Sequence, residues 1–201
     1  MEPVATIVGR AAPLPRANVD TDQIIPKQFL KRVERSGFGE YLFYDWAGDA
    51  EGELDPNFVL NMPAYAESAI LVAGPNFGSG SSREHAPWAL EDWGFRAIVS
   101  SSFADIFATN CTKIGLLPIV LTEPEVVSLL EIAGDPTNTV TVDLETQTVS
   151  ARGFEATFSI DPFTKHCLLN GLDHVALSLE HSDDISSFEQ ERPGYLPTVH
   201  L

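Results

Sequence analysis

The sequence predicts an α/β fold with an added antiparallel portion, and two patterns carry this prediction. From residue 68 to residue 133, strand-sized apolar runs alternate with helical patterns, which is typical of a parallel sheet covered by helices. From residue 139 to residue 159, β-branched residues alternate with polar residues between short turns, which indicates a β-meander. We therefore expect a parallel α/β core followed by antiparallel strands.

The first 67 residues carry few regular signals. Residues 17–30 (ANVDTDQIIPKQFL) place two acids and a threonine before a short apolar pair and a proline. This pattern predicts either a turn whose Asp side chains bond the local backbone or a loop that presents a carboxylate to a site. Residues 48–57 are rich in turn formers and acids, and we expect a surface loop or a short lobe boundary there.

Three strands and three helices are expected in alternation along the parallel part. The strands cover 68–74, 95–101 and 116–121, and the helices cover 81–93, 103–111 and 122–133. The last helix carries a capping box from Thr122 to Glu125, with Pro124 in its first turn. Each strand is thus followed by a helix that can return the chain to the same end of the sheet.

The meander and the C-terminal part follow in order. Strands are expected at 139–144, 147–152 and 154–159, and helices at 161–171, 173–180 and 184–191. Asp161 caps the first of these helices, Pro162 opens it and Gly171 ends it. At 201 residues the chain can build one good core, so we expect a single domain over 1–201, with 182–201 as a polar C-terminal extension.

Composition and charge exclude several function classes. With 12 Lys plus Arg against 29 Asp plus Glu, the net charge of −17 argues against nucleic acid or an anionic membrane as a partner. An anionic substrate would need a locally positive site. The N-terminus lacks a signal-peptide pattern and no apolar run approaches membrane-spanning length, so we expect a cytoplasmic protein with Cys111 and Cys167 as buried thiols.

Residues 76–88 (NFGSGSSREHAPW) are the strongest candidate for a site, because a strand leads through glycines into a helix. Gly78 and Gly80 allow a tight loop, and the backbone N–H groups at a helix start attract an anion. Ser81 and Glu84 fit a capping box, which is the structural alternative. Pro87 indicates that the regular helix begins nearer His85 than Ser81. Dinucleotide, phosphate-loop and hydrolase-elbow motifs do not match this loop.

The sequence GSGSSREHA resembles the signature of the aconitase superfamily, in its C-terminal swivelling domain. Two further segments match in order, namely DTDQIIP (20–26) and SSFADIFATNCTKIGLLP (101–118). Residues 37–46, 57–63 and 163–189 are similar to the bacterial small subunits of isopropylmalate isomerases. The resemblance therefore covers nearly the whole chain and implies a swivelling β/β/α domain with additional antiparallel strands and C-terminal helices.

The resemblance implies a heteromeric hydro-lyase of leucine biosynthesis, active only with its large subunit. It would interconvert 2- and 3-isopropylmalate through isopropylmaleate, using a [4Fe–4S] cluster that the large subunit holds. This chain would bind a small dicarboxylate and no metal of its own. The isolated chain could also self-associate, since it must bury an interface with its partner.

Residue roles carried over from the family centre on the glycine-rich loop. Ser81 matches the catalytic base, and Asp22 matches an acid that orients groups near the site. The expected substrate-binding residues are Ser82, Arg83, Asp20, Thr21 and Gly80, with Asp20 and Thr21 shaping the loop. Helix-start packing and capping explain His85 and Glu84.

The basic residues that follow the DTDQIIP segment do not identify the substrate. Lys27, Lys31, Arg32 and Arg35 could contact substrate or form a solvated basic face. A sister hydro-lyase subunit, of homoaconitase or dimethylmalate dehydratase, would differ mainly in residues 27–46. A non-catalytic anion-binding assembly module is the alternative from another class.

Overall fold

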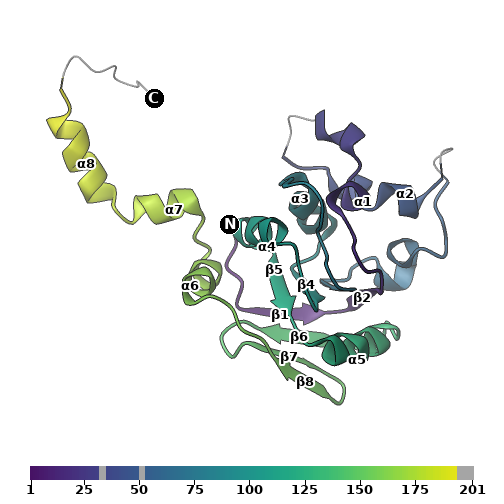
Figure 1. The fold of residues 1–201 in the computed structure, drawn as a ribbon. Helices are drawn as coiled ribbons and strands as arrows, with labels where there is room; N and C mark the ends of the chain where they lie inside the picture. The colour runs from purple at the N-terminus through teal and green to yellow at the C-terminus, as the bar shows by residue number, and fades with distance from the viewer. Residues whose placement is uncertain (32–34, 50–52, 194–201) are drawn as a thin grey trace.

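The computed structural model describes residues 1–31, 35–49 and 53–193. Arg32, the middle of the expected 48–57 loop and residues 194–201 of the expected C-terminal extension lie outside the described residues. Within them, the predicted α/β class is confirmed, because a parallel and an antiparallel sheet stack against each other with helices around them (Figure 1). The parallel sheet has the strand order β2-β3-β4-β5 and the antiparallel sheet has the order β1-β6-β7-β8.

All six strands expected between residues 68 and 159 are present, and two more precede them. The strands are β1 (Thr6–Gly9), β2 (Ala11–Leu14), β3 (Ile70–Ala73), β4 (Ala97–Ser100), β5 (Leu117–Val120), β6 (Val140–Asp143), β7 (Thr148–Ala151) and β8 (Phe154–Thr157). The sequence prediction missed β1 and β2. They are separated by Arg10 alone, and β1 pairs with β6 while β2 pairs with β3. A single extended segment therefore joins the two sheets.

The six expected helices are also present as α3 to α8, with shifted ends, while α1 and α2 were not predicted. The α-helices are α1 (Thr21–Ile24), α2 (Tyr44–Ala47), α3 (His85–Trp93), α4 (Asp105–Ile114), α5 (Glu123–Ala133), α6 (Pro162–Asn170), α7 (His174–Leu179) and α8 (Ser182–Glu191). Short 3-10 turns are η1 (Lys27–Lys31), η2 (Gly39–Tyr41), η3 (Val59–Asn61) and η4 (Pro63–Tyr65). Asp161 caps α6 and Gly171 ends it at φ +67°, as predicted.

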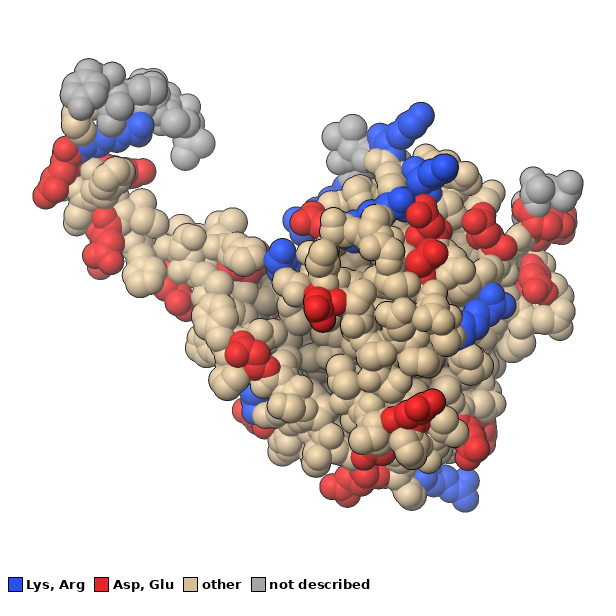
Figure 2. Space-filling model, in the orientation of Figure 1, with Lys and Arg blue, Asp and Glu red and all other residues tan. Residues whose placement is uncertain are grey.

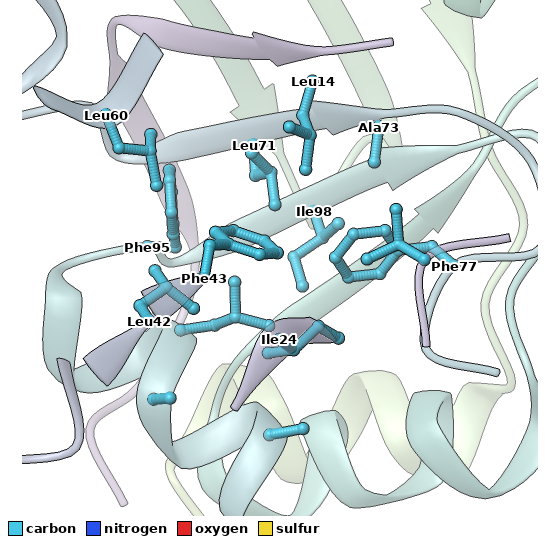
Figure 3. Close-up of a cluster of buried hydrophobic side chains, with 14 of the residues drawn as sticks. Leu14, Ile24, Leu42, Phe43, Leu60, Leu71, Ala73, Phe77, Phe95 and Ile98 are labelled. Carbon is cyan, nitrogen blue, oxygen red and sulfur yellow. The ribbon is translucent and has the colours of Figure 1, made fainter. Parts of the chain in front are cut away.

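The parallel sheet is buried on both faces and separates two hydrophobic cores. Strand side chains alternate between the faces, so Leu71 and Ile98 lie in one core while Ile70 and Val99 lie in the other. Figure 3 shows the first core, where the side chain of Ile24 from α1 packs in one cluster with strand residues. Ile24 is fully buried, so this short helix is fixed to the sheet despite having only four residues.

The C-terminal helices α7 and α8 extend away from the two sheets (Figure 1). Their apolar side chains Val175, Leu179 and Phe188 are exposed by more than half. The helix α6 belongs to the body instead, because Leu168 is buried and its carbonyl accepts a hydrogen bond from the Val4 N–H at 2.8 Å. In the described residues no helix has the length and apolar character needed to cross a membrane.

The predicted capping box of α5 is confirmed. The Glu125 carboxylate accepts hydrogen bonds from the Thr122 hydroxyl at 2.6 Å and from the Thr122 N–H at 2.8 Å. These bonds, led by the one from the hydroxyl, lower the pKa of Glu125 from its ordinary value.

Removing this cap gives a local test of the fold. We expect Thr122→Ala to lower the free energy of unfolding by about 1 kcal/mol, because the first turn of α5 loses its cap. Urea denaturation followed by circular dichroism measures the change. The control is Ser128→Ala in the middle of the same helix, which should stay within about 0.5 kcal/mol of the wild type. Equal effects of the two changes would contradict a specific capping role for Thr122.

Candidate active site

The glycine-rich loop runs from the end of β3 to the start of α3, at the carboxyl edge of the parallel sheet. Ligands of open α/β sheets bind at this edge, where strands end and helices begin. The segment that leads into α1 lies directly beside the loop, since Asp20 and Ser79 form a parallel bridge. Two motifs about 60 residues apart in the sequence therefore meet at one place.

Backbone hydrogen bonds hold the loop against this segment. The carbonyl of Val19 accepts from the N–H groups of Gly78 at 2.8 Å and Ser79 at 3.2 Å, and the Thr21 N–H donates to the Ser79 carbonyl at 2.9 Å. Gly78 and Gly80 have φ values of +76° and +95°, which favour glycine. The Val19 contribution was missed by the sequence analysis, because a backbone carbonyl leaves no signal in residue type.

The carboxylates of Asp20 and Asp22 make different contacts. Asp20 caps α1: its carboxylate accepts from the Gln23 N–H at 2.8 Å, while the Gln23 side chain accepts from the Asp20 N–H at 2.9 Å. The turn interpretation is therefore confirmed for Asp20. Asp22 points instead to the loop, where its carboxylate pairs with the Arg83 guanidinium.

The Asp22–Arg83 pair is bidentate. The Nη1–Oδ1 distance is 2.5 Å and the Nη2–Oδ2 distance is 3.1 Å. The Arg83 side chain is 20% exposed and that of Asp22 is 55% exposed, so the arginine is mostly buried beside a more exposed carboxylate. A guanidinium has five N–H donors, and this pair leaves the others available for a second carboxylate.

Ser81 and Ser82 lie on the exposed side of the loop, together with Gly80. Within the described chain, the backbone N–H groups of these three residues make no hydrogen bond to the protein. Thr21 lies beneath Ser81 and is only 1% exposed, with its hydroxyl oxygen 3.2 Å from the Ser81 Oγ. The loop therefore presents two hydroxyls and free N–H donors to whatever covers it.

The predicted capping box between Ser81 and Glu84 is wrong. The regular helix α3 begins at His85, and its N-cap residue Glu84 makes no side-chain capping bond. The Arg83 N–H donates instead to the Ser81 carbonyl at 2.8 Å, which gives an irregular opening. Pro87 in the first turn explains the late start, as its sequence position indicated.

His85 packs at the start of α3 and does not project into the loop's exposed face. Its ring lies edge-on to Phe38, with centroids 5.4 Å apart, and 4.8 Å from the Trp88 ring. Burial lowers the pKa of His85, while the Glu84 carboxylate acts in the opposite direction and Arg83 adds to the lowering. These contacts favour the packing interpretation of this histidine.

Several Lys and Arg side chains lie near α1 and α3, with Asp and Glu side chains among them (Figure 2). Figure 2 shows Lys and Arg side chains over the region where α1 and α3 lie in Figure 1. Lys27 and Lys31 are exposed in η1, and the Arg35 guanidinium lies over the Trp88 ring at 5.1 Å. The sequence analysis missed an aromatic contact here, where Phe29 stacks on Tyr41 with centroids 4.1 Å apart.

The loop does not line the groove that the described residues form beside α3. That groove, of about 920 Å³, lies on the other side of α3, where Trp88, Arg96 and Lys113 contribute to its lining. Ser81, Ser82 and Arg83 do not line it. The two candidate serines therefore lie on an open surface.

No metal centre can be built from the residues that the structure describes. They contain no group of three or more His, Cys, Asp and Glu side chains placed to hold an ion. Cys111 and Cys167 are both free and buried, and only Cys111 belongs to the core that Figure 3 shows. An iron–sulfur cluster, which needs several cysteine thiolates, does not fit the described part of this chain.

Comparisons with known proteins show the family of this chain. The family model described as Aconitase C-terminal domain matches residues 1–124, and a model described as LeuD_N matches residues 128–162. The 3-isopropylmalate dehydratase small subunit of Halalkalibacterium halodurans is 55% identical over 96% of this chain and 100% of its own. That of Rubrobacter xylanophilus is 53% identical over 99% of this chain and 100% of its own. The chain belongs to the 3-isopropylmalate dehydratase small-subunit family.

A solved member of this family has the same fold. A crystal structure of 3-isopropylmalate dehydratase from Methanocaldococcus jannaschii matches with a TM-score of 0.66 and 27% identity, over 92% of this chain and 99% of the other. The predicted aconitase C-terminal-type fold is therefore confirmed.

Two glycine variants test how the loop is shaped. We expect Gly78→Ala to lower the midpoint temperature of unfolding several-fold more than Gly153→Ala does. A Cβ at Gly78 would overlap the Phe107 ring, whereas a Cβ at Gly153 meets nothing within 4 Å. Both glycines have a positive φ, so the matched control isolates the steric overlap from backbone strain. Thermal unfolding measures both, and equal losses would contradict the close packing of the loop on α4.

Proposed function

We propose that this chain supplies one half of the active site of a 3-isopropylmalate dehydratase. The reaction interconverts 2-isopropylmalate and 3-isopropylmalate through isopropylmaleate, as a step of leucine biosynthesis. The observation that carries the proposal is the exposed pair Ser81 and Ser82 beside an oriented arginine, on an open surface. A serine that is open to bulk water is a weak base, so we propose that a second protein covers this loop.

The large subunit is the partner that we propose. The relatives are named small subunits, which supports a heteromer in which a larger chain supplies the opposing surface. We further propose that this larger chain holds the [4Fe–4S] cluster, because the described residues here have no place for it. When bound, the cluster would supply a Lewis acid for the hydroxyl group that leaves.

Ser81 is the proposed base. It would take the proton from the carbon next to a substrate carboxylate, so that the C–H bond breaks and a serine O–H bond forms. A serine acts as a base only where its alkoxide is stabilised. The free N–H groups of Gly80 and Ser82, together with the nearby Arg83 guanidinium, supply positive potential at this point.

Ser82 and Arg83 are proposed to bind a substrate carboxylate. The guanidinium can do so with the donors that Asp22 leaves unused, while Asp22 fixes its orientation. Asp20 has its carboxylate engaged in the cap of α1, so we propose that it shapes the loop. We propose that Lys27 and Lys31 in η1 add local positive charge for an anionic substrate, in a chain whose net charge is −17.

We propose the cytoplasm as the compartment. Both cysteines are free in the structure, as is usual for proteins of a reducing compartment.

Removing the proposed base tests this function. Ser81→Ala should lower kcat by at least about a hundredfold in the complex with its cluster-loaded large subunit, because the proton acceptor is lost. Turnover of 2-isopropylmalate is measured anaerobically, and co-purification measures subunit association, which should be unchanged. The control Ser159→Ala changes an exposed serine after β8 and should keep wild-type activity.

The outcomes separate the possible functions. A complex of Ser81→Ala with full activity would remove Ser81 from the mechanism. Turnover of homocitrate or dimethylmalate in place of 2-isopropylmalate would point to a sister hydro-lyase. Association with no turnover of any of the three substrates would favour a non-catalytic assembly module.

A further inference from the structure

Thr21 occupies an unusual position for a residue that only shapes a loop. It is the first residue of α1 and is 1% exposed, yet its hydroxyl faces the exposed Ser81. Its backbone is already engaged, since its N–H donates to Ser79 at 2.9 Å and its carbonyl accepts from Ile25 at 3.1 Å. The hydroxyl is therefore the part of Thr21 that remains for the site.

Two oxygens of Ser81 compete for this one hydroxyl. The Thr21 Oγ1 lies 3.2 Å from the Ser81 Oγ and 3.3 Å from the Ser81 carbonyl oxygen. A threonine hydroxyl has one proton to donate and two lone pairs to accept with. It can donate to the carbonyl while the Ser81 hydroxyl donates to it, or it can turn and donate to the Ser81 Oγ.

The surrounding packing keeps Thr21 at this distance. Gly80 has a φ of +95°, which favours glycine, and it lies against Thr21, since a Cβ there would be 3.4 Å from the Thr21 Oγ1. Ile24, one turn further along α1, is fully buried in the core and fixes the helix behind it. The hydroxyl is thus presented to Ser81 by a rigid support.

We propose that Thr21 is a positioning residue that orients Ser81 and donates a hydrogen bond to its deprotonated oxygen. This inference rests on the proposed function, in which Ser81 is the base. Before the proton transfer, the Thr21 hydroxyl donates to the Ser81 alkoxide and stabilises its negative charge. After it, Ser81 carries the substrate proton and donates to Thr21, whose own proton turns to the Ser81 carbonyl. Thr21 neither gains nor loses a proton in this cycle.

The test compares three variants in the complex with the large subunit. Thr21→Val keeps the shape of the side chain and removes the hydroxyl, so we expect kcat to fall about tenfold to a hundredfold with KM within about twofold of the wild type. Thr21→Ser keeps the hydroxyl and should retain most of kcat. The control Thr112→Val removes a hydroxyl that also donates to a backbone carbonyl, at 2.9 Å, near the end of α4. It should leave both constants unchanged.

The pH profile separates stabilisation of the alkoxide from simple support. Without the Thr21 donor, the deprotonated form of Ser81 is less stable, so the pH of half-maximal kcat should move upward in Thr21→Val. A merely structural loss would lower the rate without moving this midpoint. If Thr21→Val does not fold by circular dichroism, Thr21→Ala carries the same expectations in a smaller side chain.

Three results would overturn the inference about Thr21. Wild-type kcat and pH profile in Thr21→Val would overturn the inference and leave the proposed function standing. A loss of kcat in Thr21→Ser as large as in Thr21→Val would show that keeping the hydroxyl does not preserve kcat, and it would also overturn the inference. An inactive wild-type complex would overturn the proposed function itself, and this inference with it.

Discussion

The docking of the segment before α1 onto the glycine-rich loop is the contact on which the candidate site depends. The Val19 carbonyl accepts two N–H groups from the loop, and the Thr21 N–H returns a bond to Ser79. Because these bonds engage the N–H groups of Gly78 and Ser79, the free donors begin at Gly80. The same docking brings Asp22 within reach of Arg83. One set of backbone bonds thus determines which groups face a ligand.

A surface loop with these properties explains why a small subunit would need a partner. The Arg83 side chain is largely packed and held by Asp22, so its orientation is fixed before any ligand arrives. Ser81 and Ser82 remain exposed, and an exposed serine surrounded by water is a weak base. Covering the loop would remove this water and strengthen the attraction between the donors and an anion. The chain therefore carries preorganised groups that become useful in a closed complex.

The sequence was sufficient for the elements whose signals are local. β3 and β4 lie in apolar segments, and the capping box of α5 involves residues only three positions apart. All three features were therefore predicted. β1 and β2 were missed because Gly9 and Pro13 interrupt the pattern and their partners lie far along the chain, as in the pairing of Ala11 with Ile70. The motifs supplied the candidate site residues, but they could not predict that Thr21 and Ser81 lie in contact, since 60 residues separate them. The capping box at Ser81 failed because Pro87 delays the helix.

The most direct test of the half-site is a crystal structure of the complex of both subunits with bound 2-isopropylmalate. We predict that the Ser81 Oγ lies within about 3.5 Å of the carbon that loses its proton, as a reacting pair requires. A substrate carboxylate should contact Ser82 and the Arg83 guanidinium, with Asp22 still paired to the same arginine. A substrate bound wholly within the large subunit, with no contact to residues 80–83, would contradict the account.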